Sequence, residues 1–142
     1  LILADAMAYA RTLGAGCIVD IATLTGAVTI ALGHVNAGIL GTDQKTIDRI
    51  RHNCSITGEK FWQLPLDDEY RKAIRSDIAD IKNVGDRTAG AITAAKFLQE
   101  FVEDTPWVHM DIAGVDLDSD GRPFACKGAT GFGVRTLVKL ME

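Results

Sequence analysis

The sequence has no apolar run that approaches the roughly 18 residues needed by a membrane-spanning helix. It also has no excess of positive charge, because 15 Lys and Arg stand against 19 Asp and Glu, for a formal net charge of -4. Such a chain has no basic field that would recruit nucleic acid or an anionic lipid surface. We therefore expect neither a spanning protein nor a nucleic-acid or membrane partner.

Paired cysteines are absent as well. Cys17, Cys54 and Cys126 are an odd number and lie far apart, whereas a disulfide framework or a structural zinc site has clustered, paired spacing. No basic segment precedes the first apolar stretch, so the sequence does not predict a secretory signal peptide. Together these features favour reduced thiols in a cytoplasmic protein.

What is present is the ordinary balance of a globular domain, with 47% hydrophobic and 24% charged residues in 142 positions. Helical and extended segments alternate, which favours an α/β class with a sheet covered by helices on both faces. Apolar periodicity predicts helices at 1–13, 27–32, 43–57, 67–74, 89–102 and 132–141. Short apolar or β-branched runs predict strands at 17–23, 37–41 and 107–112, and an extended piece at 61–64. Residues 76–88 and 116–130 are predicted loops.

The first predicted helix begins at Leu1 with no Ser, Thr, Asp or Asn before it to cap its free N–H groups. We expect from this that the sequence is a fragment of a longer chain.

A possible calcium loop follows the last predicted strand. Asp116, Asp118 and Asp120 alternate and precede Gly121, as in the first half of such a loop. The twelfth position, where a bidentate Glu is needed, is Lys127. A cation at that position opposes calcium binding, so an acidic surface turn is the favoured interpretation.

Other chemical patterns are weaker. The glycine-rich residues 128–133 precede a helix and could cradle a phosphate, but glycine-rich entry to a packed helix is favoured because no strand leads directly into them. His109 and Asp111 share one face of a strand, without a third ligand placed by sequence. Structural or solvated roles are favoured for these histidines, including His34 and His52. The G-x-S-x-G and H-E-x-x-H motifs are absent.

Five blocks resemble one family in its own order. Residues 20–27 (DIATLTGA) are similar to a segment of the leucyl aminopeptidases, the cytosol aminopeptidase family of two-metal exopeptidases. Residues 80–83 (DIKN), 90–98 (GAITAAKFL), 107–114 (WVHMDIAG) and 128–131 (GATG) resemble later blocks of the same catalytic domain. The resemblance covers essentially the whole chain. It implies that residues 1–142 are the C-terminal portion of a single catalytic domain, and hence an incomplete half of it.

The same resemblance limits the expected chemistry. Leu1 matches the last residue of the family's metal-binding signature, so none of the family's metal ligands or catalytic side chains lies in this sequence. The family implies two divalent metal ions, manganese or zinc, in the parent enzyme, with none bound by ligands of this chain. It also implies peptide substrates and a homo-oligomer, a hexamer, in the intact protein.

This chain would instead supply the wall of the substrate site. By resemblance, the substrate-binding residues are Thr23, Leu24 and Gly26, in the loop after a strand, and Ala113, beyond another strand. Residues 86–88 (DRT) would lie near the rim of the pocket. The parent is then a metal-dependent aminopeptidase that hydrolyses N-terminal residues from peptides, and the isolated fragment is predicted to be inactive. The alternative is a non-catalytic truncated module that acts in assembly or binding.

Overall fold

A four-stranded sheet organises the molecule. The computed structural model describes residues 1–121 and 127–142. The sheet consists of β1 (Ile18–Ala22), β2 (Ala37–Gly41), β3 (Phe61–Gln63) and β4 (Trp107–Asp111), in the spatial order β1-β4-β2-β3. β1 runs parallel to β4 and β2 runs parallel to β3, whereas β2 and β4 are antiparallel. The sheet is therefore mixed.

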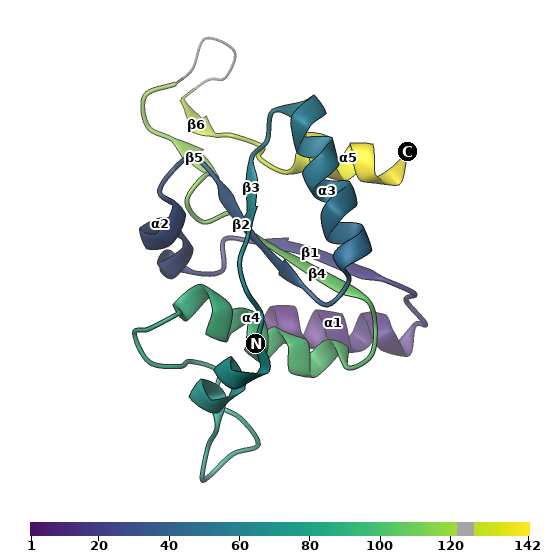
Figure 1. Cartoon of the computed structure of the whole chain (residues 1–142), viewed down its shortest axis with the longest axis vertical. Helices are drawn as coiled ribbons and strands as arrows, with labels where there is room; N and C mark the ends of the chain where they lie inside the picture. The colour runs from purple at the N-terminus through teal and green to yellow at the C-terminus, as the bar shows by residue number, and fades with distance from the viewer. Residues whose placement is uncertain (122–126) are drawn as a thin grey trace.

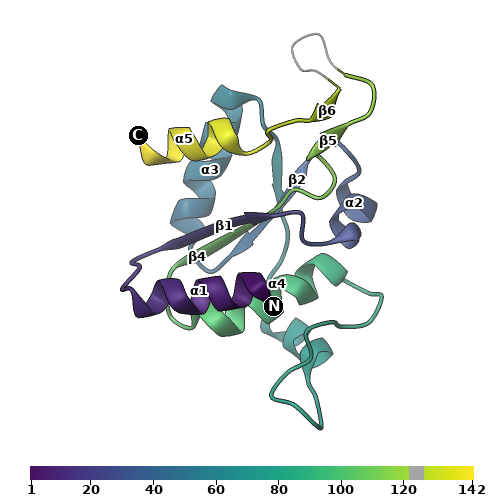
Figure 2. The same cartoon turned by 180° about the vertical axis from the view of Figure 1, so that it is seen from behind.

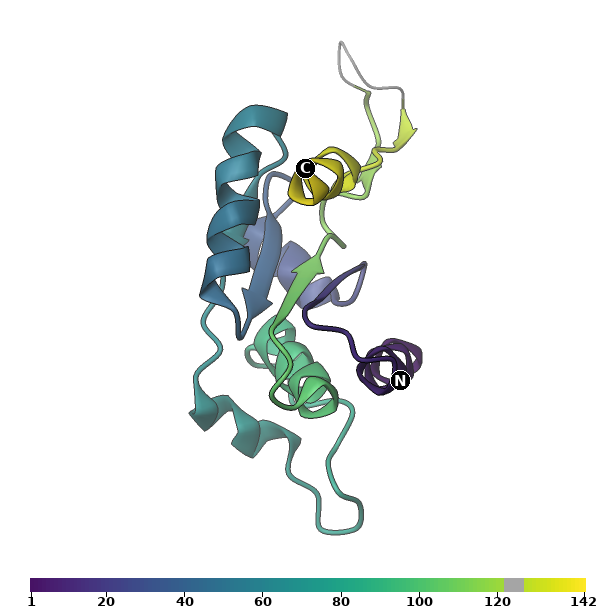
Figure 3. The same cartoon turned by 90° about the vertical axis from the view of Figure 1, so that its right-hand side faces the viewer.

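Helices cover both faces of this sheet (Figures 1 and 2). On one face, α1 (Ile2–Thr12) and α4 (Gly90–Val102) pack together over an apolar core. On the other face, α3 (Gln44–Thr57) and α5 (Val134–Met141) cover a second core. Figure 3 shows strands of the sheet between α3 on one side and α1 on the other. The predicted α/β class, with helices on both faces, is confirmed.

The smaller elements refine the prediction. A short helix, α2 (Gly26–Leu32), follows β1 as expected, but the predicted helix at 67–74 is a 3₁₀ helix, η1 (Asp68–Ile74). Within the expected loop at 116–130, β5 (Leu117–Asp118) and β6 (Gly128–Ala129) pair antiparallel. Two-residue strands carry no periodicity of their own, so the pattern could not predict them.

The glycine-rich entry to α5 is explained by packing. Gly133 has φ 93°, which L side chains rarely adopt, and a Cβ there would lie 2.4 Å from Cδ1 of Ile21. Any other residue would therefore be strained and would clash with β1. Packing, and not a phosphate cradle, accounts for this glycine, as the sequence favoured.

The start of helix α1 and two of the three cysteines agree with the sequence analysis, which predicted an uncapped first helix and reduced thiols. Helix α1 begins after Leu1 without a side-chain cap. Cys17 and Cys54 are free thiols, and burial raises the pKa of the Cys54 thiol. Cys126 lies outside the described residues.

Among the helices of the described residues, none has the length and apolar character needed to cross a membrane.

Candidate substrate site

The candidate site lies at the carboxyl ends of two neighbouring parallel strands. Ala22 of β1 and Asp111 of β4 are paired in register, and the Ile112 N–H donates to the Ala22 carbonyl over 2.9 Å. The loops that follow the two strands consequently begin side by side. In α/β sheets, ligands bind outside the carboxyl ends of the strands, so this edge is where a site is expected.

One buried carboxylate ties the two loops together. Asp111 is 1% exposed, and its Oδ1 accepts the N–H groups of Leu24 (3.1 Å), Thr25 (3.4 Å) and Ala113 (3.3 Å). Its Oδ2 accepts the Thr25 hydroxyl over 2.7 Å. Four donors replace the water that the carboxylate loses on burial. The loops after β1 and β4 are thereby fixed to one anion.

The Thr25 hydroxyl also starts the next helix. Its Oγ1 accepts the N–H of Val28 over 3.1 Å, as an N-cap does, while donating to Asp111. The beginning of α2 is thus held to the end of β4, and the backbone from Leu24 to Gly26 has little freedom to move.

A cavity of about 350 Å³ opens beside this loop. Leu24 and Gly26 line one side, and Phe97 and Leu98 of α4 line another. The loop of residues 83–86 completes the rim. Such a volume and a mainly apolar lining are typical of small-molecule sites. The cavity suits an amino-acid side chain or a short peptide segment.

The rim carries one anchored carboxylate. Asp86 Oδ1 accepts the Thr88 hydroxyl over 2.6 Å and the Thr88 N–H over 2.8 Å. These hydrogen bonds favour the charged form and lower the pKa of the Asp86 carboxyl. A negative charge therefore lies at the mouth of a mainly apolar cavity, on the segment that the resemblance places near the pocket.

The predicted substrate-binding residues fall into two groups. Leu24 and Gly26 line the cavity. Thr23 precedes Leu24 directly, and Ala113 is joined to Leu24 through Asp111, but neither contributes to the cavity lining. The sequence did not assign Asp111 this role of holding the loops. A carboxylate at the carboxyl end of a buried strand was the available signal, but its partners lie 86 and 87 residues away.

The histidines have structural surroundings. His109 is fully buried, and its Nδ1 lies 2.5 Å from Oδ1 of Asp20, whose Oδ2 accepts the Trp107 indole N–H over 2.6 Å. His34 Nδ1 lies 2.7 Å from the Gly114 carbonyl oxygen, and His52 lies exposed on α3. The expected structural and surface roles of all three are consistent with these positions.

Within residues 1–121 and 127–142, no group of three or more His, Cys, Asp or Glu side chains is placed to hold a metal ion. In the acidic loop, Asp118 Oδ1 instead accepts the N–H groups of Asp120 (3.0 Å) and Gly121 (2.9 Å), which is the geometry of an Asp-stabilised turn. The acidic surface turn favoured by the sequence agrees with this geometry.

A cavity beside the carboxyl ends of parallel strands, walled by a rigid loop, is characteristic of an enzyme domain of the α/β class. The family model described as "Cytosol aminopeptidase family, catalytic domain" matches residues 1–138. The chain therefore belongs to the cytosol aminopeptidase family.

Individual relatives agree with this assignment. A "Probable cytosol aminopeptidase" of Koribacter versatilis is 50% identical over 142 residues, which are 100% of this chain and 28% of the relative. That of Solibacter usitatus is 53% identical over 140 residues, covering 99% of this chain and 29% of the relative. A solved structure described as "Tomato leucine aminopeptidase mutant - K354E" superposes with a TM-score of 0.90 at 39% identity, over 97% of this chain and 27% of that chain. The chain thus spans less than a third of the length of these relatives.

Proposed function

We propose that this chain forms the substrate-binding wall of a metal-dependent aminopeptidase that hydrolyses N-terminal residues from peptides. The observation that carries the proposal is the Asp111 carboxylate, which fixes the loop from Leu24 to Gly26 beside a cavity of about 350 Å³. Membership of the cytosol aminopeptidase family supplies the reaction class. Residues 1–142 would then be part of a single catalytic domain.

Backbone groups are the proposed substrate contacts. The Leu24 N–H already donates to Asp111, so it is not free to bind a peptide. By family resemblance, backbone carbonyl and N–H groups of Thr23, Leu24 and Gly26 other than this one would bind the substrate amine and the developing negative charge. Because Asp111 holds these groups in place, they need no reorientation during reaction. Leu24 would contact the substrate side chain in the cavity, and Ala113, which lies outside the cavity lining, is proposed to contact it on family resemblance alone.

The described residues do not fit a metal site, because they hold no cluster of three ligand-type side chains. We therefore propose that ligands for two divalent ions, manganese or zinc, come from elsewhere in the whole protein. No step of the reaction is assigned to the ions. The part proposed for this chain is to bind and orient the peptide and to exclude water from one side of it.

Assembly and location complete the proposal. Relatives bear the name cytosol aminopeptidase, which supports a cytoplasmic location for this protein. A homo-oligomer, specifically a hexamer, is proposed for the whole protein on family resemblance. Light scattering on the full-length protein tests it, and a monomer at micromolar concentration would refute it.

The activity is tested on the full-length protein with leucine p-nitroanilide, in the presence of manganese or zinc. Release of p-nitroaniline is expected, and none is expected from the N-acetylated compound, because the free amine is part of the recognised group. If neither metal supports hydrolysis of aminoacyl anilides or dipeptides although metal binds, the proposal fails. The alternative of a non-catalytic assembly or binding module would then be preferred.

A further inference from the structure

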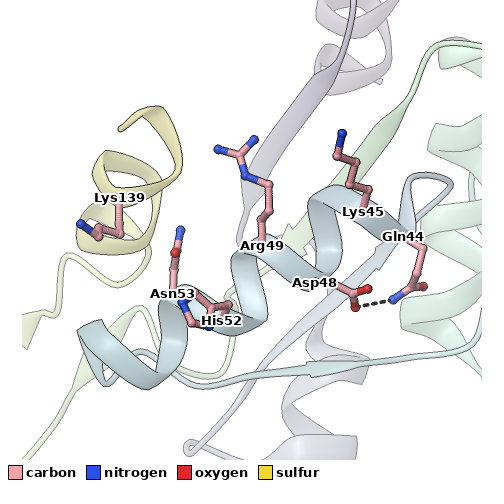
Figure 4. Close-up of a pocket in the computed structure, with 7 residues that line it drawn as sticks. All are labelled: Gln44, Lys45, Asp48, Arg49, His52, Asn53 and Lys139. Atoms are coloured by element: carbon pink, nitrogen blue, oxygen red, sulfur yellow. Dashed lines mark hydrogen bonds between the residues drawn. The ribbon is translucent and has the colours of Figure 1, made fainter.

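A second concavity among the described residues has no part in the proposed peptidase site. It is a groove of about 680 Å³ between α3 and α5, on the face of the sheet opposite the substrate cavity (Figure 4). Most of its lining comes from α3, and Lys139 of α5 supplies the other wall. Every residue that lines the groove has a polar or charged end group, and none is Phe, Tyr or Trp.

Positive charge is concentrated in this groove although the whole chain is acidic. Lys45 and Arg49 are four residues apart on α3 and point the same way in Figure 4, with Lys139 opposite. Like charges at this spacing destabilise an isolated helix by about 0.2–0.5 kcal/mol. Both side chains are exposed, so neither is buried in the packing of α3 against the sheet.

The only carboxylate in the groove lining is occupied by other groups. Asp48 Oδ1 accepts the Gln44 amide over 2.8 Å and lies 4.0 Å from Nη1 of Arg51, which is outside the groove. No ion pair of the described residues joins Asp48 to Lys45, Arg49 or Lys139. The field inside the groove favours an anion.

An unpaired amide forms part of the groove wall. Asn53 is only 8% exposed and lines the groove one turn beyond Arg49, yet its carboxamide makes no hydrogen bond within the described residues. Figure 4 shows this carboxamide directed to the same side of α3 as Arg49. The carboxamide N–H groups of Asn53 are therefore available to donate to a ligand in the groove. A ligand with acceptor oxygens would supply the missing partner.

Arg49 is held in position to bind such a ligand. Its Nη2 donates to the Leu140 carbonyl over 2.8 Å, which joins α3 to the end of α5. A guanidinium carries five N–H donors in a rigid fork, so further donors remain for an oxyanion. Lys139 forms an ion pair with Glu142, with 2.5 Å between Nζ and Oε2, so its positive charge is partly neutralised and Lys45 and Arg49 are the main cations of the groove.

We propose that the groove between α3 and α5 binds a ligand with linked phosphate groups. Lys45, Arg49 and Asn53 lie on one stripe of α3 that spans about 12 Å, given a rise of about 1.5 Å per residue. This length exceeds a single phosphate and matches a chain of two or three. Because no aromatic side chain lines the groove, the phosphate chain itself is what is recognised, and a base is not.

The test is protection of lysine side chains in the natural full-length protein, with inorganic tripolyphosphate as the probe. Acetylation by a limiting reagent is followed at each lysine by mass spectrometry, with sodium sulfate at matched ionic strength as reference. Tripolyphosphate should protect Lys45 and Lys139, while the exposed Lys60 and Lys72 elsewhere react as before. This site-specific readout does not depend on peptidase activity or on chelation of metal ions.

Matched variants separate the groove from general charge attraction. Arg49→Gln should raise the tripolyphosphate concentration needed for half protection by about tenfold or more, because a charge-assisted contact is lost. Arg51→Gln removes the same charge from the same helix outside the groove and should change it less than about twofold. Asn53→Ala should also weaken protection.

Three results would overturn the proposal. One is equal protection of all exposed lysines, and another is equal loss in Arg49→Gln and Arg51→Gln, since either shows a diffuse field. The third is protection by a nucleoside triphosphate without protection by tripolyphosphate, which shows that a base is required. Equal protection by both compounds would confirm recognition of the phosphate chain.

Discussion

The two faces of the sheet are built differently, although they share the same strands. Along β4, Trp107, His109 and Asp111 point to the α1 and α4 side, and Val108 and Met110 point to the α3 and α5 side. The first face thus buries an imidazole and a carboxylate, and the second buries only apolar side chains from this strand. Because side chains alternate along β4, one strand supplies Asp111, which positions a loop, to one face of the sheet and apolar side chains, which pack, to the other face.

The difference has an energetic basis. Apolar burial is non-directional and stabilises in proportion to area, so the side chains that β4 places on the α3 and α5 face need only well-fitted volume. Buried polar groups require partners with defined geometry, and Asp111 obtains four of them from the two loops. Loss of the Asp111 anchor on the first face should therefore appear in catalysis, and damage to the second face in stability.

The strongest test of this contrast is Met110→Ala on the packing face. Met110 is fully buried, so removal of its side chain should lower the free energy of unfolding by about 2–5 kcal/mol. Ile56→Ala, at a side chain 59% exposed on α3, should change it by less than about 0.5 kcal/mol. Urea denaturation of the full-length protein measures both. Per folded molecule, kcat/KM should be unaltered in both, and a large loss of activity in folded Met110→Ala would remove the contrast.

The complementary test is Asp111→Ala on the other face. Without the shared acceptor, the loop from Leu24 to Gly26 shifts, and misplaced binding groups cost about 100-fold in kcat/KM. Asp111→Asn keeps an acceptor oxygen for the loop N–H groups and should recover most of that loss. Steady-state kinetics on an aminoacyl anilide measures the effect.

Asp104→Ala is the matched control, because Asp104 is exposed after α4. It should leave kcat/KM within about twofold, as surface substitutions away from such features have small effects. If Asp111→Ala retained full activity, the loop would not need its anchor and the proposed role of Asp111 would be wrong.

How far the sequence predicts this structure depends on the range of each interaction. Helices with strong periodicity were placed almost to the residue, as at α3 (Gln44–Thr57), predicted at 43–57. The strand Trp107–Asp111 was predicted at 107–112. The antiparallel pairing of β2 with β4 was not predicted, since strand direction depends on contacts far apart in sequence.

In the candidate site, too, features that depend on contacts far apart in the sequence were not predicted. Leu24 and Gly26 were assigned through family resemblance, and they do line the cavity. The anchoring role of Asp111 was missed, because it exists only when the register pairs Ala22 with Asp111. The part of Phe97 in the cavity wall was also hidden, since its position on α4 indicated only an apolar face.

A smaller effect is expected for Trp107→Phe, at the other end of β4 on the same face as Asp111. Trp107→Phe keeps an aromatic ring but removes the indole N–H that donates to Asp20 Oδ2 over 2.6 Å. Loss of this hydrogen bond should cost about 1–2 kcal/mol of stability, measured by urea denaturation. Trp107 lies at the opposite end of β4 from Asp111, so kcat should be unchanged. A drop in kcat comparable to that of Asp111→Ala would show that Trp107, His109 and Asp111 act together in positioning the loop.

The smallest effect concerns the start of α3, on the packing face. The Thr46 hydroxyl donates to Asp43 Oδ2 over 2.5 Å and lowers the pKa of that carboxyl below its usual 3.8. Thr46→Val should remove about 1 kcal/mol or less at pH 7.

The pH dependence gives this prediction its sign. Because the folded-state pKa of Asp43 is depressed, the unfolded chain binds more protons as the pH falls below about 4, and the stabilisation is lost there. The gap in unfolding free energy between wild type and Thr46→Val should thus be constant from pH 5 to 7 and close at lower pH. Thr12→Val removes a hydroxyl that bonds only the Tyr9 carbonyl, so its gap should not change with pH. If the Thr46→Val gap were equally independent of pH, the Thr46 contact would not involve the charged carboxylate of Asp43.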